Sequence, residues 1–536
     1  MTTDALLIAF LALVYLTSLF GLAYLSDRNI LPVSVTRSPV LHALAQGTFI
    51  SAWGYYGIFS LAQTHGYGAL AYYLGTGALL LFAPFILIPM TRIANQFQLN
   101  SFADLLAFRF PTASLGKWVT VVLLLSAMPL MALQIKAVVE AWSIAVAPNR
   151  TEIGFSPLFA VLFVATVCSF AVIFGTGRIN QNGLVVTLAA ESVLKLAGIV
   201  SLGGVAIFSV FNGPGDLDQW LVAHPEQMNI VYQVLGQDNS PWLVLIFLSG
   251  SLLMPHAFNY NNGRKLQIRS LRIGSWLIPL YLMLMALPLF PIIWAAESLN
   301  APYIGTDYIA LGVALALENP VLLTIIVLGG LSAATGTMVL MLLTLSTMTL
   351  NHLILPRTGL PSEMSLYKWL AKWQRIAVIA LAILALLSAL VMSDASLTAL
   401  AFTAFMGTLQ LIPALIGLVL WPEARGRAIA YGIYVGAALW AMTMLIPTFI
   451  GVSSFNLELF NLSLSFGSDH WQNALALSFG ANLAVLAVVH GTSSQHEQER
   501  ESALLCGLND ESVPSMMRLV ALTPQAMIEG LTPALG

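Results

Sequence analysis

The sequence has 536 residues, of which 58% are hydrophobic and only 8% are charged. A soluble domain carries about 25% charged residues, so this composition excludes a water-soluble fold and most of the apolar surface must face lipid. The formal net charge of -3 gives no indication of nucleic-acid binding. The apolar runs are about 20 residues long, the length that a membrane-spanning helix needs. Because lipid cannot satisfy backbone hydrogen bonds, we predict an all-α membrane protein.

Thirteen apolar runs are predicted to cross the membrane. The first is interpreted as a retained span and not as a signal peptide, because it has no basic n-region and no evident cleavage site before Ser26. The predicted spans are 5–25, 39–62, 69–91, 118–146, 157–175, 183–210, 241–259, 273–296, 321–350, 376–392, 397–420, 428–449 and 470–489.

The basic residues predict the orientation of these spans. If the N-terminus lies outside, nearly all of the 21 Lys+Arg fall in cytoplasmic loops or in the C-terminal tail. Positive charge is retained on the cytoplasmic side of membranes. We therefore expect a multi-pass protein of a bacterial inner membrane, N-terminus out and C-terminus in, with lipid as its main surroundings.

Two spans are predicted to be interrupted helices. Gly54 lies in a glycine-rich stretch of the second span, AQGTFISAWGYYG, and the seventh span holds Gly250 followed by Met-Pro255-His. Transporters built from inverted repeats form their binding sites at such interruptions, in matching positions of the two halves. The spacing predicts repeats at 39–210 and 241–420. The alternative is that the glycines only allow close helix packing.

Three segments carry a resemblance to a known family. They are SFADLLAFRF at 101–110, MPH at 254–256 and PALIGLVLWPEARGRAIAYGIYVGAALW at 413–440. Together they resemble the sodium:solute symporter family over nearly the whole membrane region. The resemblance implies the LeuT-like fold of five plus five helices in inverted repeats.

A narrower resemblance concerns the symporter module of Cbr-type sensor histidine kinases. It is carried by SAWGYYG, ALQIKAV, MPH, GGLSAATG and LNHLILP, and the end of the chain, 521–536, is similar to the opening of the connector domain that follows that module. The resemblance implies a transmembrane domain at 1–490. It also implies a cytoplasmic linker and an incomplete connector domain at 491–536, with a response regulator as the partner of a downstream kinase.

The resemblance implies a cation site between the second and ninth spans. Carried onto this sequence, its ligands are the carbonyls of Gly47 and Ile50 and the oxygens of Ser332, Thr335 and Gly336. The family usually has paired hydroxyl residues where Thr335 and Gly336 stand, so one oxygen ligand is lost. Sodium and a proton both remain open as the coupling ion, and no other cofactor or metal is expected. The hydroxyls can also simply bond to the preceding helical turn.

The sixth span carries two charges four residues apart, Glu191 and Lys195. A charge at the bilayer centre costs about 2.5–3.5 kcal/mol on insertion scales, so such residues usually serve a purpose. Glutamate before lysine at this spacing favours a mutual pair. For Lys195 the structural pair is preferred, whereas Glu191 is predicted to take part in proton coupling.

Candidate solute-binding residues lie on three spans. Gln134, Lys136 and Glu140 are on the fourth span, Trp53 is near the interruption of the second, and His256 follows the proline of the seventh. Lys136 and Glu140 can bind the charged groups of an amino acid or pair with each other, and the mutual pair is favoured. His256 can bind solute, carry a proton or satisfy the carbonyls of the break.

The sequence predicts a class of function but leaves two versions of it. The lysine of sugar-transporting relatives is missing from 273–296, so a sugar is a less expected solute than an amino acid or another carboxylate. The resemblance to the Cbr-type module implies an amino acid, with histidine as the first choice. The preferred hypothesis is a cation-coupled symporter-like module that provides the input of a sensor histidine kinase. The alternative is a stand-alone symporter. No catalytic motif appears in the sequence. The chain is part of an enzyme only if the kinase hypothesis holds, and it is then the non-catalytic membrane part.

Overall fold

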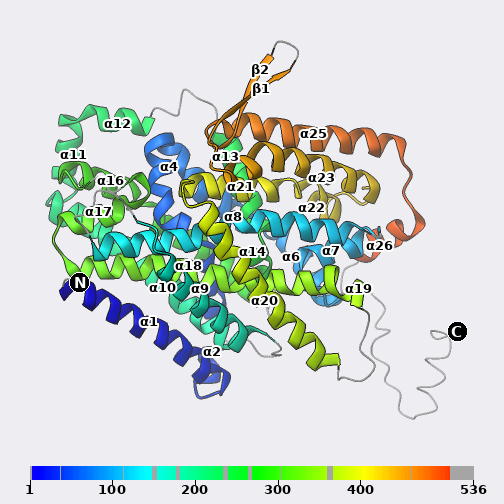
Figure 1. Ribbon diagram of the computed structural model, residues 1–536, viewed down its shortest axis with the longest axis horizontal. Coiled ribbons are helices and arrows are strands. Elements are labelled where there is room, and N and C mark those ends of the chain that lie inside the picture. Colours follow the sequence, from blue (N-terminus) through cyan, green and yellow to red (C-terminus); the bar gives the residue numbers. More distant parts are fainter. Residues whose placement is uncertain are drawn as a thin grey trace.

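The computed structural model describes residues 3–36, 38–112, 114–147, 154–176, 182–232, 240–262, 268–302, 305–358, 366–459 and 462–507. Within these ranges the chain is a bundle of helices with one short hairpin (Figure 1). Most of the predicted connector, including the segment at 521–536, lies outside the described residues.

In the described part of the chain, 10 helical segments are long and apolar enough to cross a membrane. Each coincides with one of the predicted spans, while the count of thirteen and the orientation stay predictions. The segments are formed by α1 (Thr3–Asp27), α8 (Leu115–Val146), α9 (Pro157–Phe170) with η4 (Ala171–Gly175), α10 (Asn182–Val205) with η5 (Ala206–Val210), α15 (Ile268–Ala286) with α16 (Leu289–Ser298), α18 (Pro320–Thr349) with η8 (Leu350–Ile354), α20 (Leu366–Val391), α21 (Leu397–Leu409) with α22 (Ile412–Val419), α23 (Gly426–Trp440) with η9 (Ala441–Leu445) and α24 (Ile446–Phe449), and α25 (Trp471–Thr492).

The other three predicted spans are each divided into shorter pieces, which is why they do not appear as long helices. Two of them are the spans predicted to be interrupted. The pieces are α3 (Pro39–Ala45), η1 (Gln46–Phe49), η2 (Trp53–Gly57) and α4 (Ile58–His65) in the second span, α5 (Ala71–Leu81) and α6 (Leu87–Gln96) in the third, and α13 (Ser240–Leu253) and α14 (Pro255–Asn262) in the seventh.

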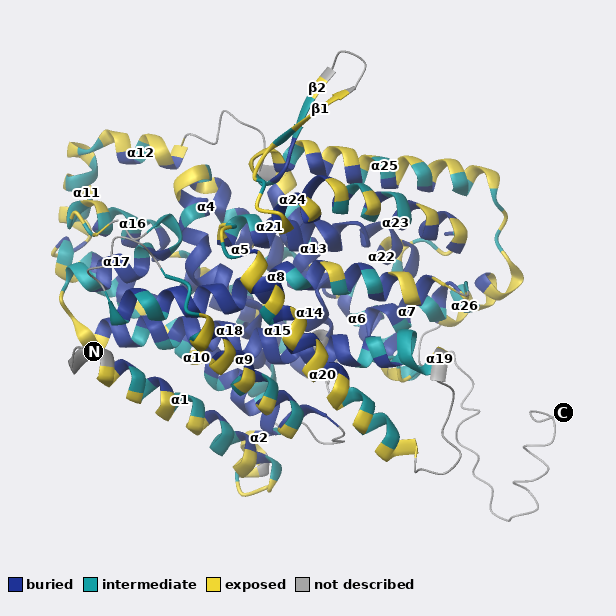
Figure 2. Cartoon of the chain, in the orientation of Figure 1, coloured by how far each residue is buried: buried dark blue, intermediate teal, exposed yellow. Residues whose placement is uncertain are grey.

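The centre of the bundle is formed by α18, α8, α21, α10 and α13, which contact one another in pairs (Figures 1 and 2). The most hydrophobic stretches of α18 and of α21–α22 are each 89% buried, against 22% in α1. Helix α1 therefore covers the outside of the bundle, and α18 runs through its core. Figure 2 shows the outward faces of α1 and α20 in yellow.

Short elements complete the fold outside the long helices. A hairpin between α24 and α25 pairs Phe455 with Phe466, and its two strands alternate apolar and polar residues. This hairpin was not part of the predicted all-α fold. The short elements are α2 (Val33–Thr36), η3 (Gly66–Leu70), α7 (Phe102–Arg109), α11 (Pro214–Ala223), α12 (Pro225–Tyr232), η7 (Thr306–Tyr308), α17 (Ile309–Ala316), α19 (Leu355–Thr358), β1 (Phe455–Leu459), β2 (Leu462–Phe466), η10 (Ser468–His470) and α26 (Glu497–Gly507).

Candidate functional site: two helix breaks and a buried ion cluster

The second span is broken between η1 and η2. Ile50 is extended, with φ -73° and ψ 100°, so the helical hydrogen-bond ladder stops there. A Cβ on Gly47 would lie 2.8 Å from the Ser192 hydroxyl, so the glycine permits the close approach of α10 to the break. Gly54 lies beyond the break, within η2, where its own Cβ would meet the Tyr72 ring.

The carbonyls of this break bind a lysine. Lys195 Nζ donates hydrogen bonds to the carbonyl oxygens of Gly47 at 3.0 Å and Ile50 at 3.1 Å. The Lys195 side chain is fully buried, with 0% of it exposed. These two carbonyls are the ones that the family resemblance implies as ligands of a coupling ion, and here the Lys195 side chain contacts both.

Glu191, one turn before Lys195, is held from two other helices. Its Oε1 accepts hydrogen bonds from Thr335 Oγ1 on α18 at 2.5 Å and from the Tyr15 hydroxyl on α1 at 3.0 Å. Ser332 Oγ donates to the Glu191 carbonyl at 3.3 Å and to the Gly329 carbonyl at 2.7 Å. Sequence reasoning missed Tyr15, whose single hydroxyl in an apolar span gives little signal.

Gly336 makes room for the Glu191 carboxylate. A Cβ at this position would lie 2.4 Å from Glu191 Oε2 and 3.0 Å from Thr48 Cγ2. The position where the resemblance expects a second hydroxyl is therefore filled by the carboxylate of α10. All five predicted cation ligands lie in one cluster with Glu191 and Lys195.

The seventh span is broken at Met254, between α13 and α14. Pro255 begins α14, while Gly250 lies within α13, where a Cβ would meet the Phe405 ring at 2.4 Å. His256 is buried, with 4% of it exposed. Helix α14 contacts both η1 and α18, so the two breaks lie next to each other against the same central helix.

Trp53 stands at the start of η2 inside an aromatic cluster formed by Trp53, Tyr72, Phe247 and Phe405. Its ring stacks on Phe247 at a centroid distance of 5.2 Å and meets Tyr72 edge-on at 5.1 Å. Trp53 is fully buried. The cluster fills the space beside the break, so a solute can reach Trp53 only when at least one of these rings moves.

Gln134 on α8 supports the same break from the other side. Its Oε1 accepts a hydrogen bond from the Ala52 backbone N–H at 2.9 Å, and its Nε2 donates to the Leu130 carbonyl at 3.2 Å. The first bond satisfies a donor that the interrupted helix leaves without an intrahelical partner. Gln134 therefore holds the start of the second half-helix in place.

Lys136 and Glu140 form an ion pair at 3.4 Å between Nζ and Oε1. Lys136 Nζ also donates to the carbonyls of Ser393 and Ala395, in the turn between α20 and α21, and Glu140 Oε2 accepts from the Tyr308 hydroxyl at 2.7 Å. The pair thus ties α8 to that turn and to η7.

Asp307 lies beside this network, outside the predicted spans. Its Oδ2 accepts a hydrogen bond from the Leu397 backbone N–H at 3.4 Å. Burial, and secondarily the negative charge of Glu140, raises the pKa of Asp307 to about 6, although the Leu397 bond opposes the rise.

At the opposite end of α18, two of the motifs with family resemblance meet. Asp104 in α7 accepts from the Asn100 backbone N–H at 3.0 Å and pairs with His352 Nε2, in η8, at 2.7 Å. The Ser101 hydroxyl caps α7 by accepting from the Asp104 N–H. Burial opposes ionisation, but the hydrogen bond and charge of His352 prevail and lower the pKa of Asp104.

Arg109, the last residue of α7, binds the tail. Its guanidinium donates to the carbonyls of Glu499 at 3.1 Å and Pro422 at 2.7 Å, and only 1% of the residue is exposed. Arg92 in α6 donates to the Cys506 carbonyl at 3.4 Å. Helix α26 is therefore docked on α7 and α22.

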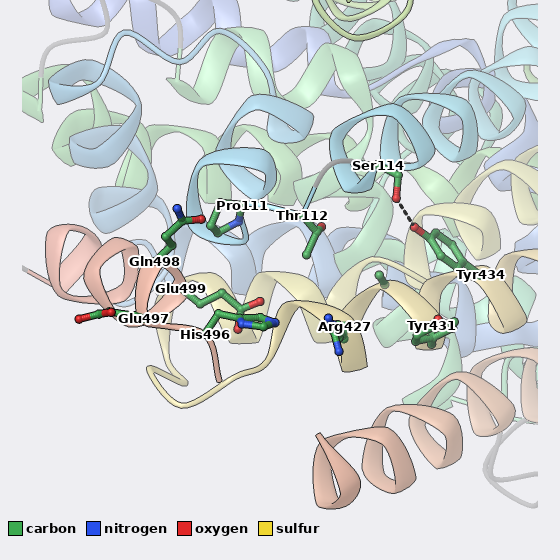
Figure 3. A pocket seen from close by; sticks show the side chains of 11 residues that line it. Pro111, Thr112, Ser114, Arg427, Tyr431, Tyr434, His496, Glu497, Gln498 and Glu499 are labelled. Atoms are coloured by element: carbon green, nitrogen blue, oxygen red, sulfur yellow. Dashed lines mark hydrogen bonds between the residues drawn. The ribbon is translucent and has the colours of Figure 1, made fainter. Parts of the chain in front are cut away.

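A cavity of about 600 Å³ opens beside this docked helix (Figure 3). Its walls come from the segment after α7, from α23 and from the start of α26. The Ser114 and Tyr434 hydroxyls contact each other at 3.1 Å at one edge of it, and Arg427 lines it from α23.

Three solved structures align over most of the chain, and the first of them shows its fold. A Na⁺-coupled sialic acid symporter, in a substrate-bound outward-open state, aligns with a TM-score of 0.64 and 14% sequence identity over 92% of this chain and 99% of that chain. The manganese transporter of Eremococcus coleocola aligns with a TM-score of 0.46 and 14% identity over 88% of this chain and 96% of its own. Mhp1, a nucleobase-cation-symport-1 family transporter, gives 0.43 and 12% identity over 86% and 95%.

No protein-family model and no curated protein sequence matches the chain. The similarity to the sialic acid symporter is therefore one of fold. The chain is a multi-pass membrane protein with a LeuT-like fold.

Proposed function

We propose that this chain is a cation-coupled symporter-like module, driven by protons or sodium, that binds a small polar solute at its two helix breaks. The single observation that carries the proposal is the position of the breaks. The carbonyls of the first and the start of α14 lie against the same central helix, α18. Interrupted helices expose backbone groups at membrane depth, and such groups are tolerated where they are buried in protein or line a water-filled cavity.

The proposed solute is an amino acid, with histidine first, or another small carboxylate. Trp53 and His256 are its proposed contacts, because each residue stands near the start of the second half of its broken helix. In the conformation described here, Gln134 holds the break and Lys136 and Glu140 close the turn before α21. Binding is proposed to accompany a rearrangement of the aromatic cluster.

We further propose that the module is the input of a sensor histidine kinase in a bacterial inner membrane, acting through a downstream kinase on a response regulator. The docking of α26 supports this role. The tail helix is held by Arg109 in α7, and α7 is in turn paired with the end of α18 through Asp104. A conformational change of the bundle would therefore alter the support of the segment that leads toward the predicted connector.

The first test is solute binding to the purified protein in lipid nanodiscs, using a panel of radiolabelled amino acids and carboxylates. We expect saturable binding of at least one panel member, and its loss in Trp53→Ala. Trp276→Ala is the matched control, because that tryptophan is 81% exposed on the outside of α15. If no panel member binds the wild-type protein, the proposed solute class is wrong.

The second test separates transport from sensing. The solute that binds is offered to proteoliposomes with an inward proton gradient, an inward sodium gradient or no gradient. Uptake driven by a gradient supports the alternative, a stand-alone symporter. Binding without uptake, together with a solute-dependent change in hydrogen exchange of α26, supports the sensor.

A further inference from the structure

The fold suggests a sodium ion at the break of the second span, and the residues present there can be tested for their fit to one. A hard cation needs several oxygen ligands around it. Both carbonyls of the break, from Gly47 and Ile50, are hydrogen-bonded to Lys195 Nζ at 3.0 and 3.1 Å. An ammonium group has only donors to offer, so it takes up oxygen atoms that a metal ion would use.

The hydroxyl groups that α18 contributes to the site also form hydrogen bonds within the protein. Thr335 Oγ1 donates to Glu191 Oε1, and Ser332 Oγ donates to the carbonyls of Glu191 and Gly329. At Gly336 no side-chain oxygen exists, and the Glu191 carboxylate fills the space. Helix α10 thus brings both Lys195 and Glu191 into the site. Lys195 is held by the carbonyls, and Glu191 by the Thr335 hydroxyl, that were expected to ligate sodium.

A sodium ion and the Lys195 ammonium cannot share this site. The two carbonyls accept from one Nζ at hydrogen-bonding distance, and a second cation on the same oxygens would be placed against a like charge in a fully buried setting. The residues therefore do not fit a bound sodium ion while Lys195 is in place.

We propose that the Lys195 ammonium is the resident cation of this site and substitutes for sodium. The broken helix is held to α10 by a covalently attached charge instead of a dissociable ion. The proposal rests on the proposed function in one respect, because it concerns the ion site of that symporter-like module. It implies that removal of the ammonium uncovers a sodium site made from the carbonyls of Gly47 and Ile50, the Thr335 hydroxyl and the Glu191 carboxylate.

The test measures sodium binding without any solute. Purified wild-type protein and Lys195→Ala in nanodiscs are compared by equilibrium binding of ²²Na⁺ and by the shift of Tm in NaCl against choline chloride at equal ionic strength. We expect no sodium-specific shift for wild type and a clear rise in Tm for Lys195→Ala. At a sodium concentration of about 100 Kd, binding raises the ratio of folded to unfolded protein about 100-fold.

Two controls and one double variant locate the effect on sodium binding. Lys117→Ala removes an exposed lysine from the start of α8 and is expected to behave as wild type. Lys195→Arg retains a cation and is expected to stay insensitive to sodium. In the double variant Lys195→Ala/Thr335→Ala, the sodium response is expected to weaken, because one proposed ligand is gone.

Two results would overturn the proposal. One is a sodium-specific rise in Tm of the wild-type protein that disappears in Thr335→Ala, since sodium would then bind beside Lys195. The other is a folded Lys195→Ala that binds no sodium. If Lys195→Ala does not fold, the wild-type and Thr335→Ala measurements still decide. Failure of the proposed function would be seen separately, as the absence of solute binding.

Discussion

The docking of α26 can be broken at one side chain, Arg109. We predict that Arg109→Met releases this helix from α7, because the substitution removes the donors to the Glu499 and Pro422 carbonyls while keeping an apolar side chain in the buried site. A hydrogen bond to a charged group contributes about 1.5–3 kcal/mol. Only the bond to Glu499 joins α26 to α7, because Pro422 lies between α22 and α23, so the docking energy lost is about 1.5–3 kcal/mol.

A loss of about 1.5–3 kcal/mol corresponds to roughly a 10- to 100-fold increase in the undocked population. Hydrogen–deuterium exchange of the α26 amides, 497–507, measures this population directly, because amides of a docked helix exchange through opening. Arg427→Met is the matched control. Arg427 is an exposed arginine that lines the neighbouring cavity from α23. Unchanged exchange of α26 in Arg109→Met, or equal acceleration in Arg427→Met, would show that Arg109 does not hold the helix.

Three further variants test other parts of the structure. Gly336→Ala places a Cβ 2.4 Å from Glu191 Oε2, and such overpacking is expected to cost about 1–3 kcal/mol in thermal unfolding. Gly204→Ala, on α10 with nothing within 4 Å, is its neutral control. Asp307→Asn is expected to stabilise the protein at pH 8 but not at pH 5, measured as Tm. Asp104→Asn is expected to make α7 less stable than in wild type at neutral pH. This difference in stability, measured by hydrogen exchange of α7, is expected to disappear as the pH falls below about 4.

The signs of the two pH effects follow from the direction of each pKa shift. The pKa of Asp307 is raised to about 6, so the folded state favours the protonated acid, and this stabilisation is lost as the pH rises through 6. The pKa of Asp104 is lowered, so its contribution is present above the ordinary carboxyl range and is lost as the pH falls. Equal Tm differences at pH 5 and pH 8 for Asp307→Asn would contradict the first. A stability difference between Asp104→Asn and wild type that stays constant down to pH 3 would contradict the effect predicted for Asp104.

Much of the architecture could be predicted from the sequence because the bilayer leaves few choices. Apolar runs of spanning length must be helices, and the proline after Met254 predicted the break in the seventh span. The partners of the charges could not be predicted in this way. Glu191 and Lys195 have the spacing of a mutual pair, yet Lys195 bonds to backbone carbonyls 145 and 148 residues away, and Glu191 to Tyr15. Bonds to backbone carbonyls leave no pattern of side chains in the sequence.

Contacts at the outside of the bundle were equally hard to predict from the sequence. The β1–β2 hairpin follows a short alternation of apolar and polar residues, FNLEL and LSLSF, which is too brief to stand out beside the long apolar runs. The role of Arg109 was also hidden, because both of its acceptors are carbonyls from distant segments. The motifs containing Arg109 and His352 meet through Asp104, a contact that the sequence did not predict.

One helix connects the ion cluster to the docked tail. Thr335 contacts Glu191 from the middle of α18, and His352, 17 residues further on, pairs with Asp104 in α7. At 1.5 Å per residue the two positions are about 25 Å apart. Contiguity alone does not demonstrate energetic coupling, which requires that a change at one end alter the effect of a change at the other.

A double-mutant cycle tests this coupling. We predict that Thr335→Val and His352→Asn are non-additive, by about 0.5 kcal/mol or more, in their effects on hydrogen exchange of α26. The physical reason is that α18 behaves as a rigid, buried rod, so loosening either end allows the same displacement. Thr335→Val combined with Arg427→Met, which lies off this route, is expected to be additive. If both pairs are additive, α18 does not transmit the state of the ion cluster, and the tail must receive its signal through another helix.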